Sequence, residues 1–205
     1  LAQLFVEVLN RRLTLLSATL PSSFIEPLAK HYSVKVLELK ENDDPIFWES
    51  KKAKKYNVNI RSIKGSDEAI SFIVQKVREG NFKKALIVLN TVEEAQRAYD
   101  RIKGLAEKVV LMHSRYTEED KKKRADEIDS LNEGVVIGTQ TVEVGLDNSY
   151  DLLITDAAPL NSLVQRFGRF LREDKDNGGE AYIIFDEEGL KESSEKSEKQ
   201  KEKYK

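Results

Sequence analysis

The chain has 205 residues, a formal net charge of −2 and no cysteine. The lack of cysteine excludes disulfides, thiolate chemistry and cysteine zinc sites, and the balanced charge excludes a strong overall positive field. With a hydrophobic content of 40%, the sequence is long and apolar enough for one packed domain.

No apolar run reaches the roughly 20 residues of a membrane span and no signal peptide is visible, so we expect a cytoplasmic protein without a membrane partner. The two histidines, His31 and His113, lie far apart in the sequence and have no ligand spacing around them. We therefore predict no metal site. The sequence begins with Leu1 inside a helical pattern, and we interpret it as a piece of a longer protein.

The first 40 residues alternate between helical and strand patterns. Helices are predicted over 1–12 and 22–30, and strands over 13–16 and 34–39. The first strand pattern ends in Ser17, Ala18 and Thr19, which taken alone form a small-residue turn. The apolar face of this region must pack somewhere, and we expect it to dock on the following domain or to drive self-association.

Residues 40–66 are polar and rich in lysine, as is typical of a connector, and a strand is predicted over 58–63. Trp48 is the one tryptophan of the chain. It could stack on a nucleic-acid base, but a lone tryptophan beside other apolar side chains more often anchors a linker, and we favour that interpretation.

From residue 67 onward, helices and strands alternate regularly. Helices are predicted over 67–79, 91–103, 117–131 and 161–172, and strands over 85–89, 109–112, 135–137, 152–155 and 181–185. The strands are continuous apolar runs, the kind that is buried on both faces of a parallel sheet. This order predicts an α/β fold with right-handed crossovers. Residues 187–205 are a charged, low-complexity segment that we expect to be flexible.

Polar residues directly follow three of these strands. In parallel sheets, ligands bind at the carboxyl ends of the strands, so these residues are candidates for a shared binding site. They are Asn90, Thr91, His113, Ser114, Arg115, Thr139 and Gln140.

The last predicted helix carries an unusual row of polar side chains. At helical spacing, Gln165, Arg169 and Arg172 share one face, and apolar residues occupy the other. Rigidly held arginines can grip phosphate oxygens bidentately, which suits a polyphosphate at the carboxyl edge of the sheet. The alternative is an ordinary amphipathic helix with a solvated charged face.

The spacing Q-R-x-G-R-x-x-R resembles the last signature motif of superfamily 2 nucleic-acid helicases. This resemblance implies that Arg169 and Arg172 act as arginine fingers on the γ-phosphate of ATP bound to the other lobe, with Gln165 in the same site. Such fingers stabilise the negative charge that spreads during phosphoryl transfer.

A second stretch, over 138–147, resembles the fifth motif of the same helicases. By this resemblance, Thr139 and Gln140 contact the nucleic acid, and Gly145 and Asp147 face the nucleotide and its ribose. The alternative is a strand-to-helix loop with a capping threonine.

Two further motifs occur in the family's order. The Ser17-Ala18-Thr19 stretch resembles the coupling motif at the end of the first helicase lobe. The residues after two strands match the positions that grip the nucleic-acid backbone, namely Asn90, Thr91, His113, Ser114 and Arg115. Backbone contacts imply tracking along a strand without reading its bases. For His113, a capping or core role remains the alternative.

Within the superfamily, these motifs are most similar to the CRISPR-associated helicase of type I interference systems, which translocates 3′ to 5′ along DNA. The resemblance implies ATP with Mg²⁺ as cofactor, bound mainly by the first lobe. It also implies single-stranded DNA, or RNA, a CRISPR surveillance complex and an HD nuclease as partners, although nothing in this chain matches such a nuclease. Two departures are the bulky Phe167 and Leu171, where other residues are common in this branch.

We therefore expect a RecA-like three-layer parallel sheet, the second lobe of a helicase, over 67–186. Residues 1–40 would be the end of lobe one, and 41–66 the linker with the first strand. The phosphate-loop pattern G-x-x-x-x-G-K-[ST] does not occur in the 205 residues, so we expect no ATP hydrolysis by this chain alone. The alternatives are a DExH or DEAD-type RNA helicase lobe and a non-catalytic nucleic-acid-binding adaptor.

Overall fold

The computed structural model describes residues 14, 22–32, 35–38, 40–143, 147–173 and 178–187. The chain divides into two compact units, residues 1–43 and residues 44–205. Several expectations fall outside the described residues: the helix over 1–12, the Ser17-Ala18-Thr19 motif, Gly145, and the charged segment beyond residue 187. No helix in the part of the chain that the structure describes combines the length and apolarity needed to cross a bilayer.

The first unit contains one described helix, α1 (Ser22–His31), which confirms the helix predicted over 22–30. The strand predicted over 34–39 is wrong for residues 35–38, which form no strand. Val36 and Leu37 are exposed there. Alternating apolar residues suit a strand only where a neighbouring strand accepts the backbone hydrogen bonds, and these four residues pair with none.

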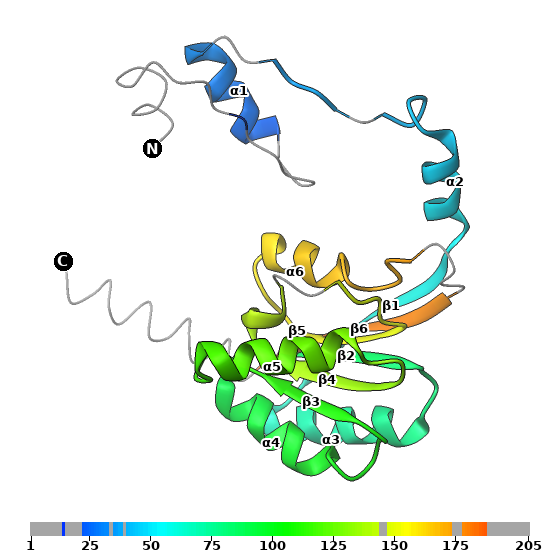
Figure 1. The fold of residues 1–205 in the computed structure, drawn as a ribbon, viewed down its shortest axis with the longest axis vertical. Helices are drawn as coiled ribbons and strands as arrows, with labels where there is room; N and C mark the ends of the chain where they lie inside the picture. The colour runs from blue at the N-terminus through cyan, green and yellow to red at the C-terminus, as the bar shows by residue number, and fades with distance from the viewer. Residues whose placement is uncertain are drawn as a thin grey trace, which may run out of the picture. The chain divides into compact units, whose positions relative to one another are not determined.

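The second unit is built on a six-stranded sheet in which every strand pair is parallel (Figure 1). The strand order is β1-β6-β5-β2-β4-β3. The strands are β1 (Lys55–Ile63), β2 (Lys84–Val88), β3 (Val109–Met112), β4 (Gly134–Gly138), β5 (Leu152–Asp156) and β6 (Gly178–Asp186). The predicted α/β class is thereby confirmed, and all the strands expected after residue 40 are present.

The helices of this unit begin and end where local signals favour it. They are α2 (Pro45–Ala53), α3 (Gly65–Glu79), α4 (Val92–Ile102), α5 (Glu118–Asp129), the 3₁₀ helix η2 (Gln140–Glu143) and α6 (Leu160–Phe167). A capping box opens α4, because Thr91 accepts a hydrogen bond from the backbone N–H of Glu94. Gly80 ends α3 in the left-handed conformation, with φ 64°.

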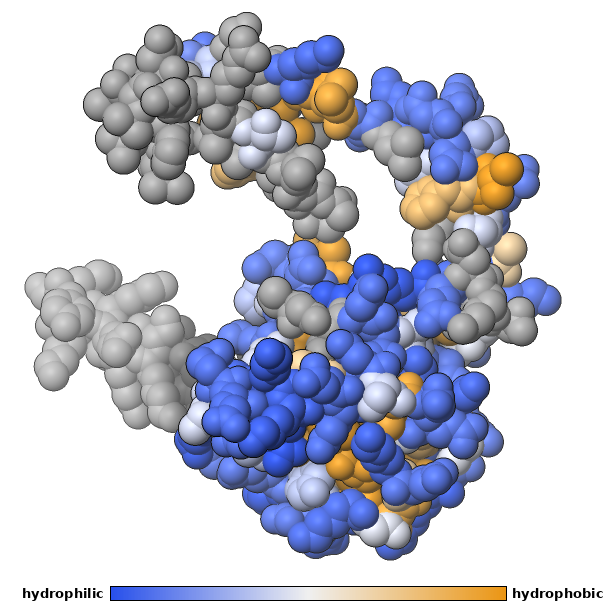
Figure 2. All heavy atoms as spheres, in the orientation of Figure 1, coloured by the Kyte–Doolittle hydropathy of each residue, from blue (hydrophilic) through white to orange (hydrophobic). Residues whose placement is uncertain are grey.

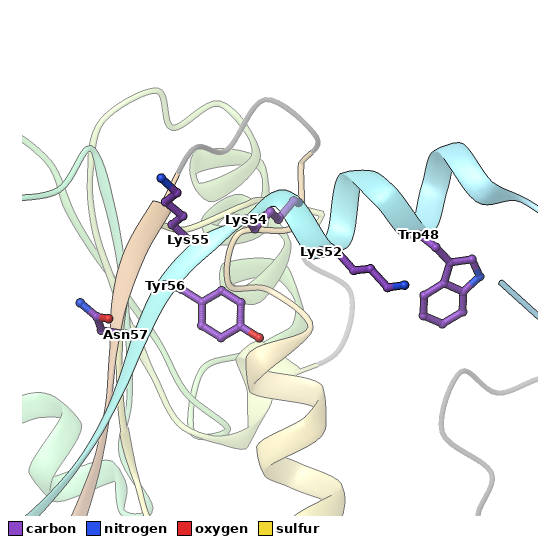
Figure 3. A pocket seen from close by; sticks show the side chains of 6 residues that line it. All are labelled: Trp48, Lys52, Lys54, Lys55, Tyr56 and Asn57. Carbon is purple, nitrogen blue, oxygen red and sulfur yellow. The ribbon is translucent and has the colours of Figure 1, made fainter.

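Helix α2 was not expected within the connector. Its start is nevertheless visible in the sequence, because Asp44 caps it by accepting from the N–H of Phe47 and Pro45 occupies the first turn. Trp48 lies edge-on to Phe47, with ring centroids 5.6 Å apart. Trp48, Lys54 and Tyr56 are among the residues that line a hollow of about 590 Å³. Figure 3 shows the side chains of these residues, with Trp48 on α2 and Tyr56 on β1.

Each face of the sheet has its own hydrophobic core, and together they give three layers. On one face, Ala85 and Ile87 of β2 pack with α3 and α4, which Figure 1 shows side by side. On the other face, Leu86 and Val88 pack with α5 and with the residues that follow α6. The outer surface seen in Figure 2 is mainly hydrophilic over α5. This is the three-layer RecA-like architecture expected from the sequence.

Candidate functional site

The carboxyl ends of four neighbouring strands are aligned by the sheet register. Gly138 of β4 pairs with both Val88 of β2 and Met112 of β3, and Val88 also pairs with Thr155 of β5. The residues that follow these strands therefore lie along one edge, as predicted. They include Asn90, Thr91, His113, Ser114, Arg115, Thr139 and Gln140, beside Asp156, the last residue of β5. We call this set of strand-end residues the carboxyl edge.

Arg166 of α6 connects three segments at this edge. Its side chain is fully buried, and its Nε donates to Glu143 Oε1 at 2.9 Å. One terminal nitrogen donates to Thr155 Oγ1 at 2.7 Å and to the carbonyl of Asp156 at 3.1 Å. The other lies 3.4 Å from Asn90 Oδ1. A buried guanidinium with this many acceptors fixes the segments after β2, β4 and β5 relative to one another.

The burial of Arg166 adds a polar group to the inward face of this helix. Ser162 and Arg166, four residues apart, are buried. Of the apolar side chains that we expected to face inward, Phe167 packs half-buried against the core, whereas Leu160 is exposed. Arg166 can be buried because Glu143 and other acceptors bind its guanidinium.

The predicted helix over 161–172 is also too long, because α6 ends at Phe167. Beyond it, the backbone pairs with Tyr150: Tyr150 donates to the carbonyl of Arg169 at 3.0 Å, and Leu171 donates to the carbonyl of Tyr150 at 2.8 Å. These bonds replace the helical ones. Gln165 on α6 is exposed, and Arg169 and Arg172 lie in the segment that follows rather than on one helical face with it.

The two arginines lie near one another in the segment that follows α6. The backbone of residues 169–173 contacts Ser149 and Tyr150, which precede β5, because the chain returns along α6 toward the amino end of the sheet. The backbone of this segment therefore lies beside the residues before β5, and a shared edge for the two guanidiniums stays a prediction. The Arg169 side chain donates to the carbonyl of Glu143 at 3.0 Å, and Arg172 pairs with Asp147 at 2.8 Å.

The charges in this arginine cluster, Arg169, Arg172 and Asp147, favour an added anion. Burial and the positive charge of Arg172 both lower the pKa of Arg169, while Asp147 opposes them. The ion pair between Arg172 and Asp147 is largely solvated, with 44% and 83% of the two side chains exposed, so it is weak and displaceable. Gly145 and Asp147 were predicted to face the nucleotide. Asp147 contacts Arg172, and Gly145 lies outside the described residues.

At the carboxyl edge, most of the predicted nucleic-acid residues make internal contacts as well. The amide of Asn90 donates to the carbonyl of Ala157 at 2.9 Å, and its backbone N–H donates to Asp156 Oδ2 at 2.7 Å. The hydroxyl of Thr91 caps α4. The hydroxyl of Thr139 is 3.3 Å from that of Thr141, and Gln140, which opens η2, is exposed.

His113 is buried at this edge and stacks on Tyr116, with ring centroids 4.0 Å apart and nearly parallel planes. Its Nε2 lies 3.4 Å from the amide nitrogen of Gln96, while within the described residues its Nδ1 has no hydrogen-bond partner. Burial lowers the pKa of His113, and the cations Arg115 and Arg124 lower it further. The imidazole is therefore neutral near pH 7 and offers hydrogen bonding rather than charge.

The two residues after His113 are exposed. Ser114 is the second residue after β3, and the guanidinium of Arg115 forms a surface ion pair with Glu93. No cluster of three or more potential metal-binding side chains occurs among the described residues.

The parallel RecA-like sheet is shared with solved helicase structures, and the comparisons with known proteins support a superfamily 2 helicase C-terminal domain. Residues 81–175 match the family described as CRISPR-associated nuclease/helicase Cas3, C-terminal. The resemblance to the CRISPR branch, stated from the motifs, is thereby confirmed for this region.

Individual relatives agree with that assignment. A putative CRISPR-associated nuclease/helicase Cas3 from Methanocaldococcus jannaschii is 38% identical over 117 residues, which are 51% of this chain and 16% of that protein. The CRISPR-associated helicase Cas3 of Thermoproteus tenax is 36% identical over 107 residues, 49% of this chain and 18% of that protein. The chain thus spans less than a fifth of these relatives.

Solved structures show the same architecture. The crystal structure of T. fusca Cas3-AMPPNP matches 65% of this chain and 18% of that chain, with a TM-score of 0.55 and 25% identity. S. cerevisiae Dbp5 bound to RNA and ADP BeF3 matches 91% of this chain and 52% of that chain, with a TM-score of 0.63. At 16% identity, this similarity supports the fold alone.

Proposed function

We propose that this chain supplies the second RecA-like lobe of an ATP-dependent helicase or translocase that moves along single-stranded DNA in the cytoplasm during CRISPR interference. The observation that carries the proposal is the arginine cluster, in which two guanidiniums lie close together and the ion pair of Arg172 with the exposed Asp147 is displaceable. The described residues thus include this arginine cluster, which favours an anion, and the polar carboxyl edge. A motor that couples a nucleotide to movement along nucleic acid requires a site for each ligand.

The residues present fit a nucleotide bound from the side of another lobe. Arg169 and Arg172 would contact its phosphates, and Asp147, once released from Arg172, would accept a hydrogen bond from the ribose. ATP with Mg²⁺ supplies the γ-phosphoryl group, whose charge two fixed guanidiniums can stabilise. The related structures named with AMPPNP and with ADP BeF3 support a nucleotide as the ligand.

Nucleic acid would bind at the carboxyl edge. Thr139 and Asn90 would supply neutral hydrogen-bonding groups and Arg115 a cation, which suits backbone phosphates. Because phosphates carry no base information, movement along the strand would not depend on its sequence. As partners of the full-length protein we propose a CRISPR surveillance complex and an HD nuclease; the relatives' names support this only through the words CRISPR-associated and nuclease.

This chain alone should not hydrolyse ATP. Its 205 residues contain no phosphate-loop pattern, so nothing here would hold the triphosphate against the arginines. Hydrolysis is therefore proposed for the full-length protein, in which another lobe presents the nucleotide. Strand-stimulated ATP turnover by the purified 205-residue chain would contradict this point.

The test is ATP hydrolysis by the full-length protein, stimulated by single-stranded DNA. Arg169→Ala and Arg172→Ala should each lower the rate by roughly a hundredfold or more and leave strand affinity nearly unchanged. Arg97→Ala is a matched control, because Arg97 is an exposed arginine on α4 that pairs with Asp67. If the arginine variants mainly lose strand binding, the arginine cluster serves the nucleic acid and the proposed assignment is wrong.

A further inference from the structure

The backbone on both sides of Arg172 is held by two residues from elsewhere in the chain. The ammonium of Lys54 donates to the carbonyls of Leu171 and Glu173, at 2.6 Å each. Ser149 Oγ accepts from the N–H of Arg172 at 2.7 Å and lies 3.4 Å from that of Glu173. The carbonyls and amides flanking Arg172 are thus fixed at the same time.

Leu171 shows how tightly this segment is determined. It is the one non-glycine residue with a positive φ in the described part of the chain, at 49°. Its side chain is nevertheless buried, and its N–H donates to Tyr150. A leucine keeps such a conformation only where the surrounding contacts over-determine it, and strained residues of this kind gather at functional sites.

Lys54 comes from a distant part of the sequence. It directly follows α2 and precedes β1, more than one hundred residues before Arg172, and Figure 3 shows it where α2 passes into β1. Two residues further, Tyr56 lies edge-on to Phe170, with ring centroids 6.0 Å apart. The entry into the sheet therefore contacts the arginine segment twice, once through Lys54 and once through Tyr56.

We propose that Lys54 is a positioning residue for Arg172, which it holds by bonding the carbonyls on either side, so that the connector helix α2 and the arginine cluster are mechanically joined. This inference rests on the proposed function, in which Arg172 acts on a nucleotide. Lys54 itself touches backbone oxygens and no substrate. Displacing an arginine by about 1 Å can lower a rate up to a hundredfold, so its support is expected to affect turnover.

The test compares strand-stimulated ATP hydrolysis by full-length Lys54→Met, Lys54→Arg and Lys55→Met proteins. Lys54→Met should lower kcat about tenfold, with KM and strand affinity within about twofold of the parent protein. Lys54→Arg keeps a cationic donor and should restore most of the rate. Lys55→Met removes the same charge one residue along and should have no effect.

The outcomes separate this inference from the proposed function. If Arg172→Ala loses hydrolysis while Lys54→Met keeps it, the positioning role is wrong. If Lys54→Met weakens strand affinity as much as kcat, Lys54 has only a general structural role and the inference is again wrong. If Arg172→Ala keeps full hydrolysis, the proposed function itself fails. If Lys54→Met does not fold, the same assay is made with Ser149→Ala. A selective loss of kcat then supports the positioning of Arg172 by its backbone contacts, and an unchanged kcat overturns it.

Discussion

The Nε of Arg166 donates to the carboxylate of Glu143 at 2.9 Å, where the arginine side chain is wholly buried and the glutamate nearly so. Glu143 ends the 3₁₀ helix after β4, and its backbone carbonyl also accepts from Arg169. This pair therefore lies between the carboxyl edge and the arginine cluster.

Breaking this buried pair should destabilise the fold. Arg166→Met leaves the carboxylate of Glu143 buried without its partner, which typically costs about 3–5 kcal/mol of unfolding free energy. Urea denaturation of the 205-residue chain measures the loss. Arg97→Ala, which breaks the exposed pair with Asp67, should change the unfolding free energy by less than about 1 kcal/mol. A similar small change for Arg166→Met would mean that solvent reaches Glu143.

The carboxylate of Asp156 makes stability depend on pH. Burial raises its pKa to about 6, against the opposing hydrogen bond from the N–H of Asn90. Because the pKa is higher in the folded state, the stabilisation is complete below the unfolded pKa of about 3.9 and is lost as the pH rises through about 6.

Asp156→Asn keeps an acceptor for the N–H of Asn90 and removes the charge. It should be more stable than the parent chain at pH 7, by at most about 3 kcal/mol, with no gain at pH 4. Denaturation midpoints of both chains between pH 4 and 7.5 provide the comparison. His113 is present in both proteins, so its contribution to the pH dependence of stability cancels when the two are compared. A constant difference across that range would refute the raised pKa.

Gly138, the last residue of β4, has no room for a side chain. An added Cβ would come within 2.3 Å of Val142 Cγ1 and 2.8 Å of the carbonyl oxygen of Met112. The second contact is with backbone inside the sheet, so it cannot be relieved by a rotamer change. Gly138→Ala should therefore destabilise the chain by about 1–3 kcal/mol or more. Gly104→Ala is the control, since nothing lies within 4 Å of its added Cβ.

Local signals in the sequence predicted the elements of the sheet unit well. The capping threonine Thr91 and the left-handed Gly80 mark helix boundaries by backbone chemistry that depends on few neighbours. The arginine helix was extended too far because apolar spacing continues through Phe170 and Leu171. In the structure those side chains are buried from a different backbone, one paired with Tyr150.

The orientation of Arg166 could not be predicted from spacing. Its acceptors come from three other segments, at Asn90, Glu143 and Thr155, and only the folded chain brings them together. An arginine side chain can be buried when such a set of acceptors binds its N–H groups. The motif did contain the signal, because Arg166 belongs to the same Q-R-x-G-R-x-x-R stretch, but spacing assigned it no role.

Salt dependence can separate the charged from the neutral contacts proposed at the carboxyl edge. In the full-length protein, Arg115→Ala should weaken binding of a labelled single strand and reduce the slope of log affinity against log salt by about one. Thr139→Val should weaken binding while leaving that slope unchanged, because a hydroxyl releases no counter-ion. Fluorescence anisotropy at several salt concentrations measures both quantities, and Arg97→Ala serves as the control cation on α4. If Thr139→Val changes only the slope, or neither variant alters affinity, the strand does not follow these strand ends and the nucleic-acid site must lie elsewhere.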